Sequence, residues 1–269
     1  MTDSFDSDSS PLFEAKKFDE PSVFTPGALL ENARRQKNLP ERSVPDICIL
    51  DPDGDIVRYL TTTGEACEDE TWPGYHTNLY RFERNGEEFG IVGCAVGASF
   101  AVLLAEQLFA AGCQFLVSVT SSGQIVPKDE PPYFVLIERA LRDEGTSHHY
   151  RSPSHYATLD NELGASVEEA CETVSRPVYT GTTWTTDAPF RETEAAIECA
   201  RSDGILAVEM EAAALYTFAE VRECPVVCFA HVTNQMGQTE EDFEKGEANG
   251  SQDALEVIDA AAIAWKSLN

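Results

Sequence analysis

Residues 92–123, VGCAVGASFAVLLAEQLFAAGCQFLVSVTSSG, decide the fold class. The first seven of them predict a strand that ends in small residues. Apolar side chains at helical spacing follow: Phe100, Leu103, Leu104 and Leu108. Gly112 closes this helix, and Gln114–Val119 predicts a buried strand that ends in Thr120–Gly123. A strand, a helix and a second buried strand in succession are typical of α/β proteins.

The rest of the chain continues this alternation. Further strands are expected at residues 46–50, 80–84, 88–92, 133–137, 177–180 and 225–232. Helices are expected at residues 27–36, 165–173, 192–200, 207–221 and 253–268. Asn85-Gly86 between two strands predicts a tight hairpin. We therefore predict a single α/β domain over residues 21–269, with a mostly parallel or mixed central sheet and helices on both faces.

Two segments lack apolar periodicity. Residues 1–20 are rich in Asp and Ser and are expected to form a disordered tail. Residues 237–252 are acidic and are expected to form a surface loop near the carboxyl end of a strand. Ligands bind at that edge of α/β sheets. The candidate site segments there are residues 94–98, 120–124, 232–236 and the loop after residue 50.

The composition excludes several classes of partner. The 269 residues include 19 Lys and Arg against 47 Asp and Glu, which gives a formal net charge of −28. A surface this acidic repels nucleic acid and anionic membranes. The composition is typical either of a protein from a salty cytoplasm, where salt screens the self-repulsion, or of an ordinary acidic protein. The eight cysteines form no Cys-x-x-Cys pair, so neither a metal site nor a redox dithiol is expected. The chain shows no signal peptide and no apolar run of transmembrane length, which predicts a cytoplasmic protein.

Residues 208–214, VEMEAAA, carry two carboxylates two positions apart. Glu209 and Glu211 face the same side only if the backbone is extended there. An extended entry into the Ala-rich helix would present a carboxylate to the hydroxyl groups of a sugar. The alternative is a solvated helix N-terminus, where acidic residues are favoured by the helix dipole.

Two further segments are rich in hydrogen-bonding groups. Hydroxyls and backbone N–H groups at residues 120–124 suit an oxyanion or a base amide, and Gly97 is placed to act similarly; a simple tight turn is the alternative. In residues 182–193, TTWTTDAPFRET, Phe190 is placed to stack on a base and Arg191 to bond a carbonyl. That segment also predicts a helix N-cap near Asp187, with Pro189 in the first turn.

Together these segments resemble the nucleoside phosphorylase family, from about Asp46 to the C-terminus. Val208-Glu209-Met210-Glu211 is similar to its ribose-binding signature, residues 94–98 and 120–123 to its phosphate and base segments, and residues 142–147 to a further stretch of it. The resemblance implies the following contacts: Glu209, Met210 and Glu211 with ribose; Gly97, Ser121 and Arg142 with phosphate; Ser122, Gly123, Phe190, Arg191 and Asn234 with the base. Glu211 and Arg191 would be catalytic.

The resemblance also implies phosphate as co-substrate, no metal or organic cofactor, and homo-oligomers built from dimers, commonly hexamers. Purine enzymes of the family carry an Asp at the position of Asn234. An Asn at this position resembles the uridine enzymes and favours a pyrimidine nucleoside. The phosphate-binding arginines expected from the resemblance are absent at their aligned positions, with Ser118 at one of them. Two alternatives follow: Arg58, Arg81, Arg142 or His76 supplies the charge for phosphate, or Asp51, Asp53 or Asp55 activates a water, as in hydrolytic members. Phosphorolysis, hydrolysis and binding without turnover all remain open from the sequence.

Overall fold

A computed structural model of the chain describes residues 10, 12–13, 16–235 and 245–269. The α-helices are α1 Pro26–Lys37, α2 Asp55–Thr63, α3 Ala98–Ala110, α4 Asn161–Cys171, α5 Glu194–Ser202, α6 Ala212–Arg222 and α7 Ser251–Ser267. The strands are β1 Ile47–Asp51, β2 Ala66–Glu68, β3 Tyr80–Arg84, β4 Glu87–Gly93, β5 Phe115–Gln124, β6 Tyr133–Asp143, β7 Tyr156–Thr158, β8 Val178–Thr186, β9 Ala207–Glu209 and β10 Val226–Asn234. Short 3-10 turns are η1 Ser147–His149, η2 Pro189–Arg191 and η3 Glu247–Gly250.

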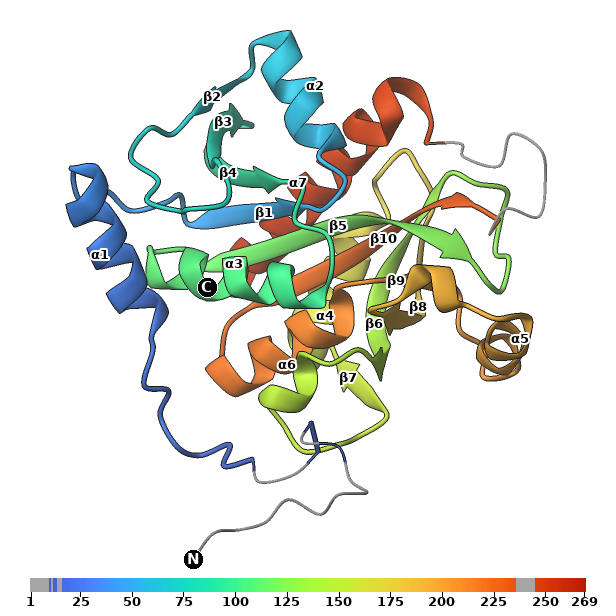
Figure 1. Ribbon diagram of the computed structural model, residues 1–269. Coiled ribbons are helices and arrows are strands. Elements are labelled where there is room, and N and C mark those ends of the chain that lie inside the picture. Colours follow the sequence, from blue (N-terminus) through green and yellow to red (C-terminus); the bar gives the residue numbers. More distant parts are fainter. Residues whose placement is uncertain (1–9, 11, 14–15, 236–244) are drawn as a thin grey trace, which may run out of the picture.

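One mixed sheet contains all ten of these strands (Figure 1). β1, β4, β5 and β10 run parallel in neighbouring pairs, whereas β6 is antiparallel to β10 and β8 is parallel to β6. β9 pairs with both β8 and β5, so five strands close into a ring in the order β5, β10, β6, β8, β9. The antiparallel strands β3 and β2 extend the sheet beyond β4. The predicted mixed sheet is confirmed.

Helices cover both faces of the sheet. α3 packs against α1 and α6, and α7 packs against α2 and α4. Figure 1 shows α3 and α6 in front of the sheet and α7 behind it. The central strands β1, β5 and β10 are almost entirely buried because both faces are covered, which is why they begin with apolar residues, and their polar residues gather toward their carboxyl ends. Phe115 of β5 stacks on Trp265 of α7 with ring centroids 5.2 Å apart, and burial of such an aromatic contributes roughly 1.5–3 kcal/mol.

The local predictions hold where short-range sequence decides the structure. Asn85 and Gly86 join β3 to β4 with φ angles of 54° and 79°, as the predicted tight hairpin requires. Residues 207–209 form the strand β9, which corresponds to the extended alternative for this segment, whereas the helix expected over residues 207–221 begins only at Ala212. Two expectations were wrong. Thr120–Gly123 lie within β5 and not in a turn, because β10 and β9 pair with this strand up to Gly123 and Gln124.

The second wrong expectation concerns the start of α5. Its N-cap is Thr193, whose hydroxyl accepts from the Ala196 amide, and not Asp187. Asp187 instead accepts a hydrogen bond from the Gly145 amide at 2.7 Å. Pro189 begins the separate turn η2.

Parts of two predicted loops lie outside the described residues. The predicted tail covers residues 1–20, of which residues 1–9, 11 and 14–15 are not described. Within the rest of it, Phe13 packs edge-on against His148 and Lys16 lies 2.8 Å from His149. In the predicted surface loop 237–252, residues 237–244 are not described, and residues 247–250 form η3.

Candidate active site

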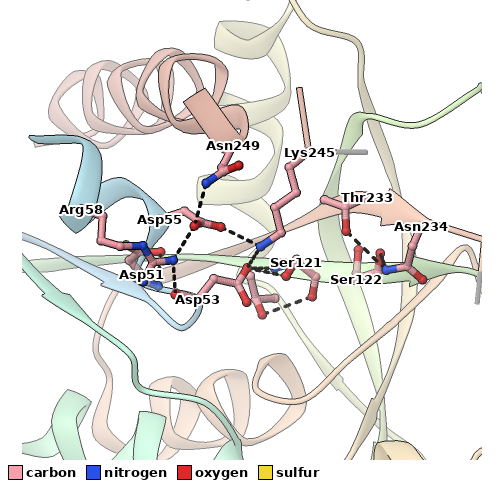
Figure 2. Close-up of polar contacts among 12 residues, drawn as sticks. Asp51, Asp53, Asp55, Arg58, Ser121, Ser122, Thr233, Asn234, Lys245 and Asn249 are labelled. Carbon is pink, nitrogen blue, oxygen red and sulfur yellow. Dashed lines mark hydrogen bonds and ion pairs between the residues drawn. The ribbon is translucent and has the colours of Figure 1, made fainter. Parts of the chain in front are cut away.

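The carboxyl ends of β1, β5 and β10 meet at one edge of the sheet (Figure 2). Asp51 ends β1, Ser121 lies beside His231 in the register of β5 and β10, and Asn234 lies beside Gly123. The loop after β1 and the N-terminal end of α7 border the same edge. Three of the four predicted site segments are therefore adjacent, and Glu211 joins the fourth, residues 94–98, to them.

Glu211 is the buried carboxylate that links α6 to the glycine turn before α3. Its Oε1 accepts from the Gly97 amide at 2.6 Å, and its Oε2 accepts from the Met210 amide at 3.2 Å. Gly97 has φ 93° and ψ 148°, a conformation essentially restricted to glycine, which directs this amide at the carboxylate. Burial, together with the nearby charge of Glu209, raises the pKa of Glu211 to about 8.

Glu209 is also buried, but its oxygens are fully used by the protein. Oε2 accepts from the amides of Glu211 and Ala212, each at 2.7 Å. Oε1 accepts from the hydroxyls of Thr183 at 3.1 Å and Thr185 at 2.5 Å. Burial raises its pKa, and these donors oppose that effect. Glu209 therefore secures the start of α6 on β8, which differs from the ribose contact predicted for it.

Ser121 is bonded to an acidic side chain from the loop after β1. The Ser121 amide donates to Asp53 Oδ2 at 3.1 Å, and the Ser121 hydroxyl donates to the same oxygen (Figure 2). The amide and the hydroxyl of Ser121, one of the residues predicted to contact phosphate, are thus both occupied by a carboxylate of the chain itself. An amide and a hydroxyl that converge on one anionic oxygen form an anion-binding pair.

Lys245 supplies a positive charge next to this carboxylate. Its Nζ lies 3.4 Å from Asp53 and 2.6 Å from Asp55, and these carboxylates together raise the Lys245 pKa despite partial burial. Asp55 also accepts from Arg58 at 2.5 Å and from Asn249 at 3.3 Å. Lys245 and Arg58 lower the pKa of Asp55, against the opposing effect of burial. Figure 2 shows Lys245 reaching down between Asp55 and Ser121.

Asp51 serves the helix that follows it. Its carboxylate accepts from the amides of Gly54 at 3.1 Å and Val57 at 2.9 Å, at the N-terminus of α2. Burial raises its pKa to about 7. Of the aspartates predicted to activate water, Asp51 is therefore committed to a helix terminus, whereas Asp53 lies directly against Ser121.

A small cavity of about 20 Å³ lies beside these groups and is bordered by Ser121, His231 and Ser251. His231 is stacked on Phe134 with ring centroids 4.5 Å apart. Burial, assisted by the charge of Lys245, lowers the His231 pKa to about 4, so the ring is neutral at pH 7. Within the part of the chain that the structure describes, neither the His231 Nε2 nor the Ser251 hydroxyl, both buried, has a hydrogen-bond partner.

The predicted base-contacting residues fall into two groups. Asn234 donates to the Ser122 carbonyl at 3.3 Å and lies beside Gly123, so these three are adjacent (Figure 2). Phe190 and Arg191 lie on η2 after β8, and both are exposed, Phe190 at 99%. No hydrogen bond or ring contact described for Phe190 or Arg191 joins them to Asn234.

Arg142 is buried and bonded to its own loop. Its guanidinium donates to the hydroxyls of Ser147 at 2.8 Å and Ser154 at 2.6 Å and to the Ser152 carbonyl at 2.9 Å. Burial lowers its pKa. These contacts anchor the loop after β6, which differs from the phosphate contact predicted for Arg142. The sequence analysis did not identify Lys245, because this residue lies far from Asp53 along the chain. Only the folded structure brings the two side chains together.

Comparison with known proteins gives the family. The sequence profile of the phosphorylase superfamily matches residues 46–267. The chain belongs to the phosphorylase superfamily. It is 26% identical to a uridine phosphorylase of Thermococcus kodakarensis, covering 76% of this chain and 83% of that protein. It is 24% identical to a guanosine phosphorylase of Halorubrum lacusprofundi, covering 50% of this chain and 56% of that protein.

Solved structures of the superfamily share the fold. A uridine phosphorylase from Vibrio fischeri ES114 superposes with a TM-score of 0.70 at 22% identity, covering 86% of this chain and 96% of that one. The same enzyme complexed with 6-hydroxy-1-naphthoic acid gives a TM-score of 0.63 at 19% identity. Within the part of this superfamily member that the structure describes, no helix is long and apolar enough to cross a membrane. The same residues contain no cluster of His, Cys, Asp or Glu that could hold a metal ion.

Proposed function

We propose that this superfamily member cleaves the N-glycosidic bond of a nucleoside by phosphorolysis. The observation that carries the proposal is the buried Glu211 carboxylate, held by the Gly97 amide and by the hydroxyl of Thr120, the residue of β5 directly before Ser121. The names of its relatives, a uridine and a guanosine phosphorylase, support the same reaction class.

Glu211 would bind the sugar in its ionised form. Two neighbouring ribose hydroxyls are donors, and a carboxylate accepts from both. Each such bond stabilises the ionised form, so nucleoside binding lowers the Glu211 pKa from its value of about 8 in the free protein. Turnover at subsaturating nucleoside should therefore rise with pH up to about 8. Met210, half-buried beside it, would support the face of the sugar.

The bond changes follow from this placement. The C1′–N bond breaks and its electron pair leaves with the base, which afterwards takes up a proton. C1′ gains oxocarbenium character, which the negative Glu211 stabilises. A phosphate oxygen then forms the new bond to C1′, and the products are free base and ribose 1-phosphate. Phosphate is the only co-substrate in this scheme, and no further cofactor is assigned.

The base is proposed to be a pyrimidine. Asn234 lies next to Ser122 and Gly123, and its amide group offers both a donor and an acceptor to a pyrimidine carbonyl and N3–H. The guanosine phosphorylase among the relatives makes the purine alternative a real one. Phe190 and Arg191 would need to move from their exposed positions to meet the base.

A second candidate is hydrolysis of the same bond. The specific observation in its favour is that Asp53 already occupies both donors of Ser121. In that case Asp53 accepts a proton from a water that attacks C1′, and the products are free base and ribose.

Base release from a panel of pyrimidine and purine nucleosides, with and without phosphate at matched ionic strength, separates the candidates. Phosphate-dependent release of uracil is the expected result. Equal release without phosphate would establish hydrolysis. Ligand-induced thermal stabilisation without any release would indicate a binding protein. A cytoplasmic location and assembly into dimers or hexamers remain proposals, and the assembly can be checked by sedimentation velocity.

A further inference from the structure

We propose that Lys245 is the phosphate-binding cation of this site and that Asp53 is a built-in competitor, which phosphate must displace from Ser121. The inference rests on the proposed phosphorolysis. It assigns the two residues that set the affinity for the co-substrate in a chain that lacks the arginines expected at this site.

Asp53 binds Ser121 in the way that an anionic ligand would. One carboxylate oxygen accepts from both the amide and the hydroxyl of Ser121. A phosphate oxygen offers the same acceptor to the same two donors. Because one set of donors cannot serve two anions, phosphate can bind Ser121 only after the Asp53 side chain has moved away.

Lys245 is positioned to follow the anion. Its Nζ contacts the Asp53 carboxylate at 3.4 Å, and its side chain is 25% exposed. Lysine carries a compact charge on a flexible stem, and it binds phosphate as a point charge. Arg58 points elsewhere: its guanidinium is bonded to Asp55 and to the Asp53 carbonyl, and its side chain is 60% exposed. Lys245 is thus the cation that contacts the carboxylate bound to Ser121.

The cavity beside Ser121 provides an independent indication of a ligand. The His231 Nε2 and the Ser251 hydroxyl border it, and among residues 10–235 and 245–269, as far as these are described, neither has a hydrogen-bond partner, although the two residues are only 6% and 0% exposed. Ser251 is the first residue of α7; its amide is bonded to the Ala248 carbonyl, and the N-cap, Gly250, has no side chain that could bond the amides that follow. Buried polar atoms are almost always paired, and the free amides of a helix N-terminus favour an anion.

The size of the cavity explains why Asp53 has to leave. About 20 Å³ holds roughly one water molecule and not a phosphate. Movement of the Asp53 carboxylate would join this space to the region in front of Ser121. Phosphate would then lie among Ser121, Lys245, Ser251 and the first turn of α7. The affinity for phosphate is therefore the outcome of a competition between an internal and an external anion.

The experiment measures KM for phosphate and for nucleoside in the full-length chain and in three variants: Asp53→Asn, Lys245→Met and the double variant. Asp53→Asn removes the competing charge and should lower the phosphate KM about tenfold or more. Lys245→Met should raise it about tenfold or more. The nucleoside KM should stay within about twofold in both. Asp203→Asn and Lys266→Met are matched controls that make the same charge changes at exposed positions remote from Ser121.

The double variant separates direct contact from simple neutralisation of Asp53. If Lys245 binds phosphate, Lys245→Met still raises the phosphate KM in the Asp53→Asn background. If Lys245 only neutralises Asp53, the substitution has no effect there, and the inference is overturned. A phosphate KM that is unchanged in both single variants overturns it as well, while leaving phosphorolysis intact.

Phosphate-induced thermal stabilisation keeps the test independent of turnover. The midpoint of unfolding is recorded with phosphate and with chloride at equal ionic strength. The inference expects more stabilisation by phosphate in Asp53→Asn than in the wild type, and less in the double variant than in Asp53→Asn. If base release is independent of phosphate, the proposed function fails; if phosphate also stabilises none of the variants, this inference fails with it.

Discussion

Replacing Glu211 with glutamine should make the protein more stable at high pH and nearly inactive. The buried Glu211 carboxylate accepts from the Gly97 amide, and its pKa is raised from 4.5 to about 8 by burial and by the nearby Glu209 charge. Because the folded state holds this proton more tightly than the unfolded state, the group's contribution to stability is complete below about pH 4.5. It is lost as the pH rises through about 8.

The size of the stability change follows from the difference between the two pKa values. A difference of about 3.5 pKa units, at 1.36 kcal/mol each, means that the wild type loses about 5 kcal/mol of unfolding free energy between pH 4 and pH 9. The Glu211→Gln variant keeps its free energy of unfolding over this pH range, because the glutamine side chain does not ionise. Its NH2 group, however, faces the Met210 amide, and an unmade buried hydrogen bond costs about 1–3 kcal/mol. The net gain at pH 9 is therefore about 2–4 kcal/mol. For 269 residues, 1 kcal/mol moves the unfolding midpoint by about 2 °C, which predicts an increase of about 4–8 °C.

The assay is thermal unfolding of wild type and Glu211→Gln at pH 5 and pH 9, with the exposed Glu172→Gln as control. At pH 5 the two midpoints should agree within about 4 °C, with the variant no higher than the wild type. Loss of the charged acceptor for two ribose hydroxyls, at about 1.5–3 kcal/mol each, should reduce kcat/KM by about 100-fold or more. A variant that is less stable than the wild type at pH 9, or that keeps near-normal turnover, would refute the placement of Glu211.

Three further substitutions test the rest of the site. Thr185→Val removes a hydroxyl from the buried Glu209 carboxylate and should cost about 2–4 kcal/mol in urea unfolding; a loss under about 0.5 kcal/mol contradicts the structural role of Glu209. Arg142→Met should loosen the loop over residues 147–154, and limited proteolysis should therefore cut this loop faster, while the phosphate KM stays unchanged. A selective rise in the phosphate KM would instead support the phosphate contact predicted for Arg142 from the sequence. Asn234→Asp supplies an acid able to donate to purine N7, and should shift the purine-to-pyrimidine ratio of kcat/KM by about tenfold, whereas an unchanged ratio would separate this position from base choice.

Features set by neighbouring residues were predictable from the sequence. The Asn85-Gly86 hairpin needs two positive φ angles, which these residue types tolerate. The Ala-rich helix after residue 211 was likewise predictable, but the spacing of Glu209 and Glu211 left an extended entry and a helix N-terminus equally open, and only the structure shows the strand at residues 207–209. The alternation of apolar strands and helices is likewise readable along the chain, because both faces of the central sheet are covered.

Features set by distant residues were not predictable. Whether Thr120–Gly123 form a turn or a strand depends on β9 and β10, which pair with them from more than 80 residues away. Likewise, the role of Glu209 depends on the hydroxyls of Thr183 and Thr185 on β8, which are more than 20 residues away from it in the sequence. Asp53 reaches Ser121 across 68 positions. No local pattern encodes such contacts, so the composition of the anion site emerges only from the fold.

A 31P NMR time course of the purified protein with uridine and inorganic phosphate tests phosphorolysis directly. If phosphate is the nucleophile, the phosphate signal declines while a sugar 1-phosphate signal grows at the rate of uracil release. Uracil release with an unchanged phosphate signal and free ribose as product would contradict phosphorolysis and make Asp53 the base that activates water. No reaction with uridine or with any other nucleoside would contradict the proposed enzyme function as a whole.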